Sequence, residues 1–248
     1  MDIVWLTAFI DRDDAGYESA IEFWRLVAST GVSERRGPAG AFVTLIPPAA
    51  DAHLRVQRTP DGRRGCHLDI HVTDVETAAE LATAAGAEIT HRDGHVALRS
   101  PGGFEFCFVN AHDEANRDDP GRQDPPRAID QLCIDVPHEM WEAEGAFWSA
   151  LLDRKLGTGV LAEYAWMNGL DGLPLRLLFQ RLGEDDERTA VTAHLDLACG
   201  SNIDPIATQH RALGATVVSS GRYWTTLVDP TGMEYCLTMR DPTTGTIS

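Results

Sequence analysis

Lysine is almost absent from this chain: Lys155 is the only one, and arginine carries the rest of the positive charge. Positive charge is scarce altogether, because 21 basic side chains stand against 38 acidic ones and the formal net charge is −17. A field of this sign repels phosphate backbones and anionic lipid surfaces. We therefore expect no nucleic-acid partner and no membrane partner, and we interpret the acidic surface as a source of solubility.

Long apolar runs and paired cysteines are missing as well. The apolar stretches are far shorter than the roughly 20 residues that a membrane-spanning helix needs. The first residues, Met1–Trp5, are acidic rather than basic and do not fit a signal peptide, so a cytoplasmic location is expected. The five cysteines are odd in number and form no CxxC pair, which argues against a disulfide framework or a zinc ribbon.

Internal repetition is the most informative feature that is present. The segment His67–Ile70 (HLDI) is matched by His194–Leu197 (HLDL), and the segment Ser100–Phe108 is matched by Asp229–Leu237. Pairs of residues at the start of each copy and in its middle also correspond. The number of residues that separates each matched pair is, in chain order, 124, 123, 127, 128 and 129. This colinear drift indicates a duplication with small insertions. We predict domain 1 at 1–111, a linker at 112–127, domain 2 at 128–241 and a tail at 242–248.

The pattern within each copy predicts an α+β fold. Apolar residues at helical spacing predict four helices: Tyr17–Ala28, Val75–Ala85 (with Asp74 as its N-cap), Trp141–Leu152 and Pro205–Leu213. Short β-rich runs between these helices, such as His67–Val72 and Phe104–Val109, predict strands. Runs of antiparallel strands with one helix per half are typical of layered α+β domains.

Three motifs carry a resemblance to a known family: the strand that begins His-Leu-Asp, the upstream Leu-x-x-Gln-Arg, and the ending Asp-Pro-x-Gly-x-Glu-(Phe/Tyr)-Cys. In domain 1 the ending keeps this form except that Ser100 replaces the aspartate. The chain thereby resembles the vicinal-oxygen-chelate superfamily, of the glyoxalase/bleomycin-resistance type. The resemblance implies two tandem glyoxalase-like domains, each built of two βαβββ modules whose curved mixed sheet surrounds a cup. The superfamily includes isomerases, dioxygenases, epoxide-opening resistance enzymes and drug-binding proteins.

Alternation along the strands predicts which side chains line the cup. Leu68, Ile70 and Val72 share one face of their strand, so His67 and Asp69 belong to the other. The same reasoning, with aromatic side chains placed for stacking, gives the expected ligand-binding set: Gln57, His67, Asp69, Glu105, Cys107, Gln131, Trp166, Gln180, His194, Asp196, Trp224, Glu234 and Cys236.

Each member of this set has a structural alternative. The histidines serve as metal ligands, as substrate contacts, or only as hydrogen-bond partners of the nearby aspartates. The cysteines act as nucleophiles or as small buried apolar residues. The aspartates act as general bases or hold local turns.

The resemblance also implies where a metal ion binds in metal-dependent members: His or Gln on the first strand, the histidine at positions 67 and 194, and Glu in the closing strand. Here the closing-strand position holds Cys107 or Cys236, and the first strand offers Thr7 or Gln131. We therefore expect no metal cofactor. The alternative is a divalent metal in domain 2, bound by Gln131, His194 and Glu234.

The functional expectation follows from these points. The chain is expected to bind a small aromatic or polar organic molecule without a metal, in the manner of a drug-sequestering protein. The alternatives are a metal-dependent lyase, isomerase or dioxygenase with its site in domain 2, and a catalytically idle scaffold. Because two fused copies can satisfy within one chain the pairing that single-domain relatives make between chains, we expect a monomer, with a homodimer as the alternative.

Overall fold

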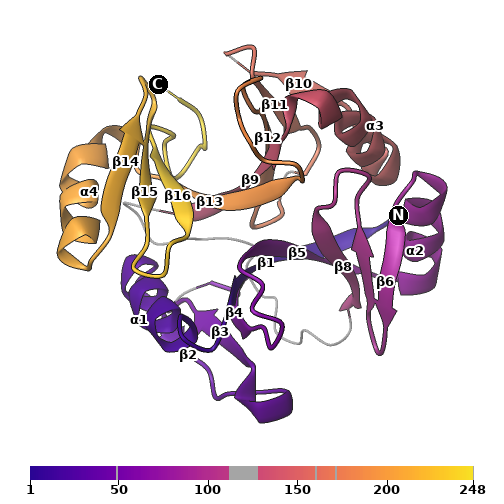
Figure 1. The fold of residues 1–248 in the computed structure, drawn as a ribbon, viewed down its shortest axis with the longest axis horizontal. Helices are drawn as coiled ribbons and strands as arrows, with labels where there is room; N and C mark the ends of the chain where they lie inside the picture. Colours follow the sequence, from indigo (N-terminus) through magenta and orange to yellow (C-terminus); the bar gives the residue numbers. More distant parts are fainter. Residues whose placement is uncertain (49, 112–127, 160, 171, 248) are drawn as a thin grey trace. The chain divides into compact units, whose positions relative to one another are not determined.

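The computed structural model describes residues 1–48, 50–111, 128–159, 161–170 and 172–247. The predicted linker, 112–127, lies outside the described residues. The described part contains two eight-stranded sheets, one from each sequence repeat, with strand orders β2-β3-β4-β1-β5-β8-β7-β6 and β10-β11-β12-β9-β13-β16-β15-β14 (Figure 1). The identical order confirms the duplication and the tandem α+β architecture that the sequence predicts.

The elements of the two halves correspond one to one apart from short 3-10 turns. The first half contains β1 (Ile3–Arg12), α1 (Tyr17–Val27), β2 (Gly31–Val32), β3 (Phe42–Ile46), β4 (Leu54–Arg58), β5 (Gly65–Val72), α2 (Val75–Ala84), β6 (Glu88–Arg92), β7 (Val96–Arg99) and β8 (Glu105–Asn110). The second half contains β9 (Ala128–Val136), α3 (Trp141–Leu152), β10 (Leu156–Thr158), β11 (Tyr164–Met167), β12 (Arg176–Arg181), β13 (Thr192–Ala198), α4 (Ile203–Ala212), β14 (Thr216–Ser220), β15 (Trp224–Val228) and β16 (Glu234–Thr238).

The predicted helices are present with small shifts at their ends. Helix α3 has the predicted bounds, and α4 begins at Ile203, two residues before the predicted Pro205. Asp74 caps α2 as predicted, since its Oδ1 accepts a hydrogen bond of 3.0 Å from the backbone N of Thr77. Among the described residues, no helix is both long and apolar enough to cross a membrane.

Contacts divide the chain into two compact units that do not follow the order of the repeats. Unit 1 contains described residues within 1–8, 67–111 and 132–193, and unit 2 contains those within 9–66, 128–131 and 194–247. Each unit therefore combines one βαβββ module from each sequence repeat. The boundaries that we predict for the sequence domains stay a prediction.

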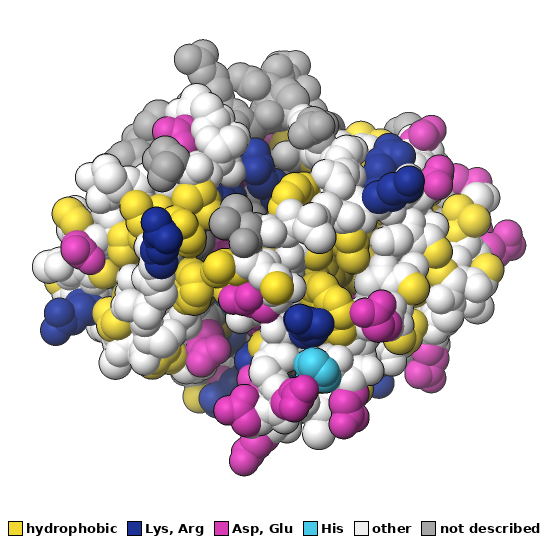
Figure 2. Space-filling view, turned by 90° about the horizontal axis from the view of Figure 1, so that it is seen from above, with side chains coloured by type: hydrophobic (Ala, Val, Ile, Leu, Met, Phe, Trp, Pro, Cys, Tyr) yellow, Lys and Arg dark blue, Asp and Glu magenta, His cyan; other side chains and the backbone are white. Residues whose placement is uncertain are grey.

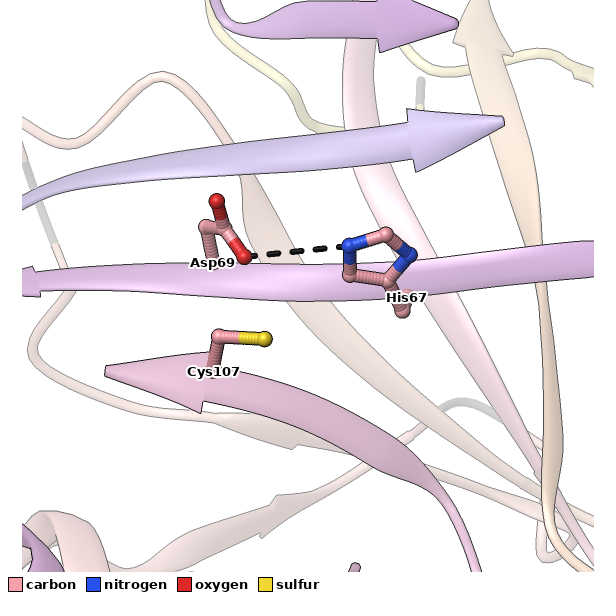
Figure 3. Close-up of side chains that lie close together, drawn as sticks. All are labelled: His67, Asp69 and Cys107. Carbon is pink, nitrogen blue, oxygen red and sulfur yellow. Dashed lines mark ion pairs between the residues drawn. The ribbon is translucent and has the colours of Figure 1, made fainter. Parts of the chain in front are cut away.

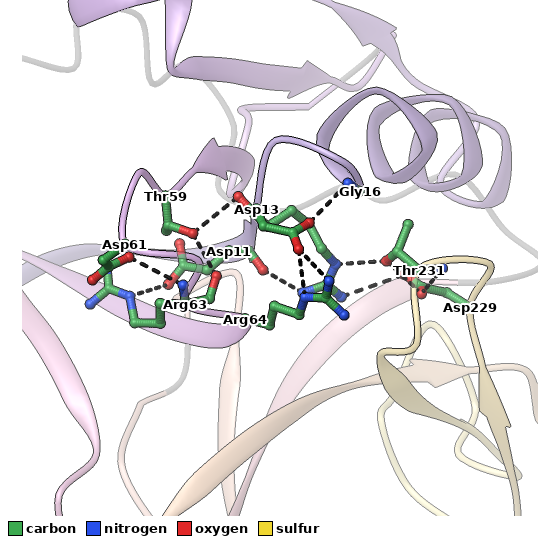
Figure 4. Close-up of polar contacts among 10 residues, drawn as sticks. Asp11, Asp13, Gly16, Thr59, Asp61, Arg63, Arg64, Asp229 and Thr231 are labelled. Carbon is green, nitrogen blue, oxygen red and sulfur yellow. Dashed lines mark hydrogen bonds and ion pairs between the residues drawn. The ribbon is translucent and has the colours of Figure 1, made fainter.

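Acidic side chains are dispersed over the face drawn in Figure 2, and the fewer Lys and Arg side chains stand among them singly or in small groups. Many of the arginines that the structure describes form ion pairs, for example Arg64 with Asp13 and Arg63 with Asp11 (Figure 4). That the acidic composition supports solubility stays a prediction.

In unit 2, the buried carboxylate of Asp229 joins a turn to helix α1. Its Oδ1 accepts hydrogen bonds from the backbone N atoms of Thr231 (2.7 Å) and Met233 (2.9 Å), and its Oδ2 accepts one of 2.9 Å from Nε1 of Trp24. The buried Arg12 adjoins this junction: its Nη2 lies 3.6 Å from Asp229 Oδ2, and its Nε donates to Thr231 Oγ1 at 2.7 Å (Figure 4). The Asp-Pro-x-Gly motif thus holds two modules together.

Unit 1 makes the same junction although its turn lacks the aspartate. Ser100 stands at the equivalent position, and its Oγ accepts a hydrogen bond of 3.1 Å from the backbone N of Phe104. The carboxylate comes instead from Glu144 of α3, which is fully buried. Its Oε2 accepts from the backbone N of Gly102 at 2.9 Å, and its Oε1 accepts from Nε1 of Trp148 at 2.8 Å. In each unit one carboxylate therefore accepts hydrogen bonds from both a turn and a tryptophan. It belongs to the turn in unit 2 and to the helix in unit 1.

Candidate functional site

The pairing of the histidine-bearing strands with the closing strands decides which side chains share a face. In unit 1, β5 and β8 are parallel, with Leu68 beside Phe106 and Asp69 beside Cys107. Phe106 packs against Trp148 of α3 with a ring-centroid distance of 5.3 Å. Because neighbouring residues in a register share a face, Leu68 lies on the helix side and Asp69 and Cys107 lie on the opposite face.

Unit 2 repeats this arrangement. Strands β13 and β16 are parallel, with Leu195 beside Tyr235 and Asp196 beside Cys236. The Tyr235 ring lies 5.2 Å from Trp24 of α1, so this face of β16 is covered by a helix. Asp196 and Cys236 again belong to the opposite face. The alternation that the sequence predicts for both histidine-bearing strands is therefore present.

Four of the predicted residues meet in unit 2, and we call them the domain-2 cluster: Gln131, His194, Asp196 and Cys236. The ligand atoms of His194, Asp196 and Cys236 all lie within 4.8 Å of one another. His194 Nε2 is 3.3 Å from Asp196 Oδ1, and Gln131 Nε2 donates to Asp196 Oδ2 at 2.5 Å. Asp196 is 3% exposed and Cys236 is 8% exposed, so the group is largely shielded from solvent.

The carboxylate of Asp196 is unequally satisfied. Oδ2 accepts the hydrogen bond from Gln131, whereas Oδ1 is buried and has no hydrogen-bond partner within the described part of the chain. A buried carboxylate oxygen without such a partner is costly unless a cation or a donor compensates for it. This oxygen lies 3.3 Å from His194 Nε2.

A related group, the domain-1 cluster, lies in unit 1 and contains His67, Asp69 and Cys107 (Figure 3). Its ligand atoms also lie within 4.8 Å of one another, but His67 Nε2 is farther from its carboxylate, at 3.8 Å from Asp69 Oδ1. On the first strand, Thr7 occupies the position equivalent to glutamine 131. The Oγ1 of Thr7 lies 2.9 Å from His71 Nε2. In the other copy, Gln131 instead contacts the carboxylate of Asp196.

The donor set of the domain-2 cluster fits a borderline or soft divalent cation. Imidazole, carboxylate and thiolate are all zinc ligands, and three protein ligands with one open position are typical of catalytic zinc sites. Zinc–nitrogen and zinc–oxygen bonds in a tetrahedral site place neighbouring ligand atoms about 3.4 Å apart. The 3.3 Å between His194 Nε2 and Asp196 Oδ1 agrees with such an edge. The carboxylate that the closing strand lacks is thus available from the histidine-bearing strand itself.

Glu105 and Glu234, the glutamates of the closing strands that we expected to contact a ligand, have other surroundings. Glu105 accepts hydrogen bonds from Arg99 of the neighbouring strand at 3.0 and 3.3 Å. Glu234 is exposed at the start of β16 and does not belong to the group that His194 forms with aspartate and cysteine. The alternative metal set predicted from the sequence is therefore assembled only in part: Gln131 and His194 each contact Asp196, and Glu234 is not in this group.

The remaining predicted ligand residues lie elsewhere on the sheets. Gln57 is half-buried on β4 opposite Phe42, and Gln180 is half-buried on β12 opposite Tyr164. Gln180 Oε1 is 3.9 Å from the thiol of Cys133. Their role as ligand contacts stays a prediction.

The two predicted stacking tryptophans each cover a glycine. Trp166 is 42% exposed on β11, and a Cβ atom added to Gly157 of β10 would lie 2.7 Å from its ring. Trp224 on β15 similarly approaches Gly221, at 2.4 Å from a Cβ added there. Both rings thus lie close to the backbone of a glycine. Stacking on a ligand stays a prediction for both.

Sequence reasoning did not identify an ion pair behind the domain-2 cluster. Arg240 is buried just beyond β16, and its guanidinium binds Asp130 of β9 through two hydrogen bonds of 2.7 and 2.8 Å. Asp130 directly precedes Gln131. A single sequence carried no signal for this pair, because its partners are 110 residues apart and belong to no motif.

Comparison with known proteins agrees with this architecture. The glyoxalase-like domain family matches residues 8–109 and again residues 131–238. Solved structures with the same fold include the Mn(II)-bound glyoxalase from Novosphingobium aromaticivorans (TM-score 0.65, 14% identity, covering 98% of this chain and 86% of that one). The 2,3-dioxygenase LapB from Pseudomonas sp. KL28 gives a TM-score of 0.65 at 13% identity, with 96% and 93% covered.

A third structure is 2,2',3-trihydroxybiphenyl 1,2-dioxygenase from Sphingomonas wittichii strain RW1, with a TM-score of 0.64, 12% identity, and 96% and 90% covered. At these identities the likeness shows a shared fold. Among curated proteins, none matches the chain in sequence. Because one family model matches both repeats, the chain belongs to the glyoxalase-like domain family as a tandem two-copy member.

Proposed function

We propose that the domain-2 cluster holds a divalent cation and that the protein is a metal-dependent enzyme acting on a small, oxygen-bearing organic molecule. One observation carries this proposal: His194, Asp196 and Cys236 converge within 4.8 Å around a buried carboxylate oxygen that has no hydrogen-bond partner among the described residues. Solved proteins that share the fold include a Mn(II)-bound glyoxalase and several dioxygenases, which makes metal chemistry on small molecules a consistent choice.

Each residue of the cluster has a distinct task in this proposal. His194, Asp196 and Cys236 would hold the cation. Gln131 anchors Asp196 through Oδ2, so that Oδ1 stays directed toward His194. A cation bound there supplies a Lewis acid that polarises a carbonyl or hydroxyl oxygen of the bound molecule. Burial of the cluster excludes bulk water and strengthens these electrostatic contacts.

A second candidate is metal-free binding of a small aromatic or polar molecule, the function expected from the sequence. A specific observation favours it: the closing strand offers Cys236 where metal-dependent relatives are expected to have a glutamate, and Asp196 already has a partner in Gln131. In this case His194 and Asp196 act as hydrogen-bonding groups toward the organic ligand.

Metal analysis of the purified full chain tests the first proposal. The chain is loaded with Zn²⁺ or Co²⁺, dialysed, and assayed for bound metal by plasma mass spectrometry. We expect tightly bound metal in the wild type, a loss of that metal in His194→Ala and Cys236→Ala, and no loss in the matched control Cys199→Ala, which removes another buried thiol of the same repeat. Retention of all metal in both site variants would overturn the assignment to this cluster.

A thermal-shift screen of the metal-free chain tests the second candidate. Stabilisation by planar phenols or quinones that His194→Ala abolishes, in a wild type that binds no metal, would replace the first proposal with the second. The monomeric state and the cytoplasmic location expected from the sequence stay predictions, and sedimentation of the purified chain checks the first of them.

A further inference from the structure

The ion pair between Arg240 and Asp130 fixes the strand that carries Gln131. Both nitrogens of the guanidinium fork engage both oxygens of the carboxylate, at 2.7 and 2.8 Å. This bidentate geometry restricts rotation of both side chains and thereby the backbone of β9 at that point. The next residue, Gln131, donates to Asp196 of the cluster. Arg240 therefore supports the position of Gln131 against Asp196.

The positive charge of Arg240 also acts on the cluster directly. Burial disfavours the charged guanidinium, yet the negative charges of Asp130 and Asp196 raise the pKa of Arg240 above its ordinary value. Charge as well as geometry therefore holds Arg240 in this place.

Domain 1 differs at the equivalent positions. By the offsets of the repeat, the positions of Asp130 and Arg240 correspond to Leu6 and Ala111, neither of which carries a charge. Domain 1 also has a shorter side chain, Thr7, at the position of the glutamine. The two clusters share the same histidine, aspartate and cysteine but differ at these three positions.

We propose that Arg240 is a positioning residue for the domain-2 cluster: it holds Gln131 against Asp196 through Asp130. This inference rests on the proposed function. Residues behind the ligands of a metal site typically change its affinity by about 10- to 100-fold when removed.

Co²⁺ titration of the full chain provides the test, because thiolate-to-cobalt charge-transfer absorption reports ligation by cysteine. The absorption is assigned to domain 2 by its loss in Cys236→Ala, with Cys107→Ala as the matched variant for domain 1. We expect Arg240→Met to weaken Co²⁺ binding at domain 2 by about 10- to 100-fold. Arg240→Lys, which keeps the charge but loses the two-pronged hydrogen bonding, should bind Co²⁺ with an affinity between those of the wild type and Arg240→Met. Domain 1 should respond to neither.

A double-mutant cycle separates positioning from mere stability. Gln131→Ala removes the group through which Arg240 acts, so adding Arg240→Met to it should lower the unfolding temperature but weaken Co²⁺ binding little further. The inference is overturned if Arg240→Met weakens Co²⁺ binding as much in the Gln131→Ala background as in the wild-type background, or if Arg240→Met binds Co²⁺ like the wild type. If the wild type itself binds no Co²⁺, the proposed metal function fails instead.

Discussion

The junction made by Glu144 gives a prediction that can be worked through quantitatively. Replacing Glu144 with alanine removes the acceptor of two buried donors, the backbone N of Gly102 and Nε1 of Trp148. Leaving a buried donor unsatisfied costs about 1–3 kcal/mol. Two donors therefore cost about 2–6 kcal/mol, and we expect about 3 kcal/mol because burial of the carboxylate is itself unfavourable. For a chain of this size, that corresponds to a fall in Tm of about 6–12 °C.

The other repeat supplies the rescue. There the helix position equivalent to Glu144 holds Ala20, and the turn position equivalent to Ser100 holds Asp229. The carboxylate is thus on the helix in one repeat and on the turn in the other. Adding Ser100→Asp to Glu144→Ala should restore part of the lost stability, because the carboxylate returns from the turn. The recovery should be incomplete, since Arg12 supports Asp229 in unit 2.

The sign of the effect of Ser100→Asp is the decisive result. In the wild-type background, it places a second carboxylate against the buried Glu144 and should destabilise the chain. In the Glu144→Ala background, it should stabilise the chain. Thermal and urea unfolding followed by circular dichroism give both values. If Ser100→Asp lowers stability equally in the two backgrounds, the two residues do not share one role and the reasoning is refuted.

Four further predictions follow from the same structure. Burial raises the pKa of Glu144 above its ordinary value of 4.5. The stability that this raised pKa contributes is therefore fully present below about pH 4.5 and is lost as the pH rises through the raised pKa. Over that pH range the free energy of unfolding of the wild type should fall relative to that of Glu144→Gln. Arg12→Met should cost about 3–5 kcal/mol in urea unfolding, because Asp229 stays buried without its cation. Burial raises the pKa of the Cys66 thiol to about 12, so mass spectrometry should find Cys66 unlabelled by iodoacetamide in the folded chain at neutral pH and labelled after unfolding. Gly157→Ala should displace the ring of Trp166 and change its fluorescence, whereas an unchanged spectrum would contradict the close contact.

The sequence predicted the fold from patterns that are local. Two-residue alternation predicted the two faces of His67–Val72, and the structure places Leu68 and the histidine on opposite faces of the strand as expected. Helical spacing predicted α3 with its bounds. The repeat provided a check on each of these inferences, since an error in one copy would have appeared as a mismatch in the other.

The parts that were missed depend on contacts between distant segments. The substitution of Ser100 for aspartate was visible in the sequence, but the compensating Glu144 was not, because nothing local links a helix residue to a turn 44 positions earlier. The carboxylate at Asp196 was assigned to the correct face, yet its contact with Gln131 depends on the register between separate strands. The support from Arg240 lies outside every motif.

The parallel pairing of β13 with β16 has a consequence for how this protein can evolve. Between the two copies, segment lengths have drifted in several places, but the distance from the aspartate or serine of the turn to the following cysteine is the same in both. One extra residue there would rotate Cys236 toward the helices and expose Tyr235 on the polar face. Natural variants of this chain should therefore tolerate length changes in most connections while keeping the eight residues from position 229 to 236 free of insertions.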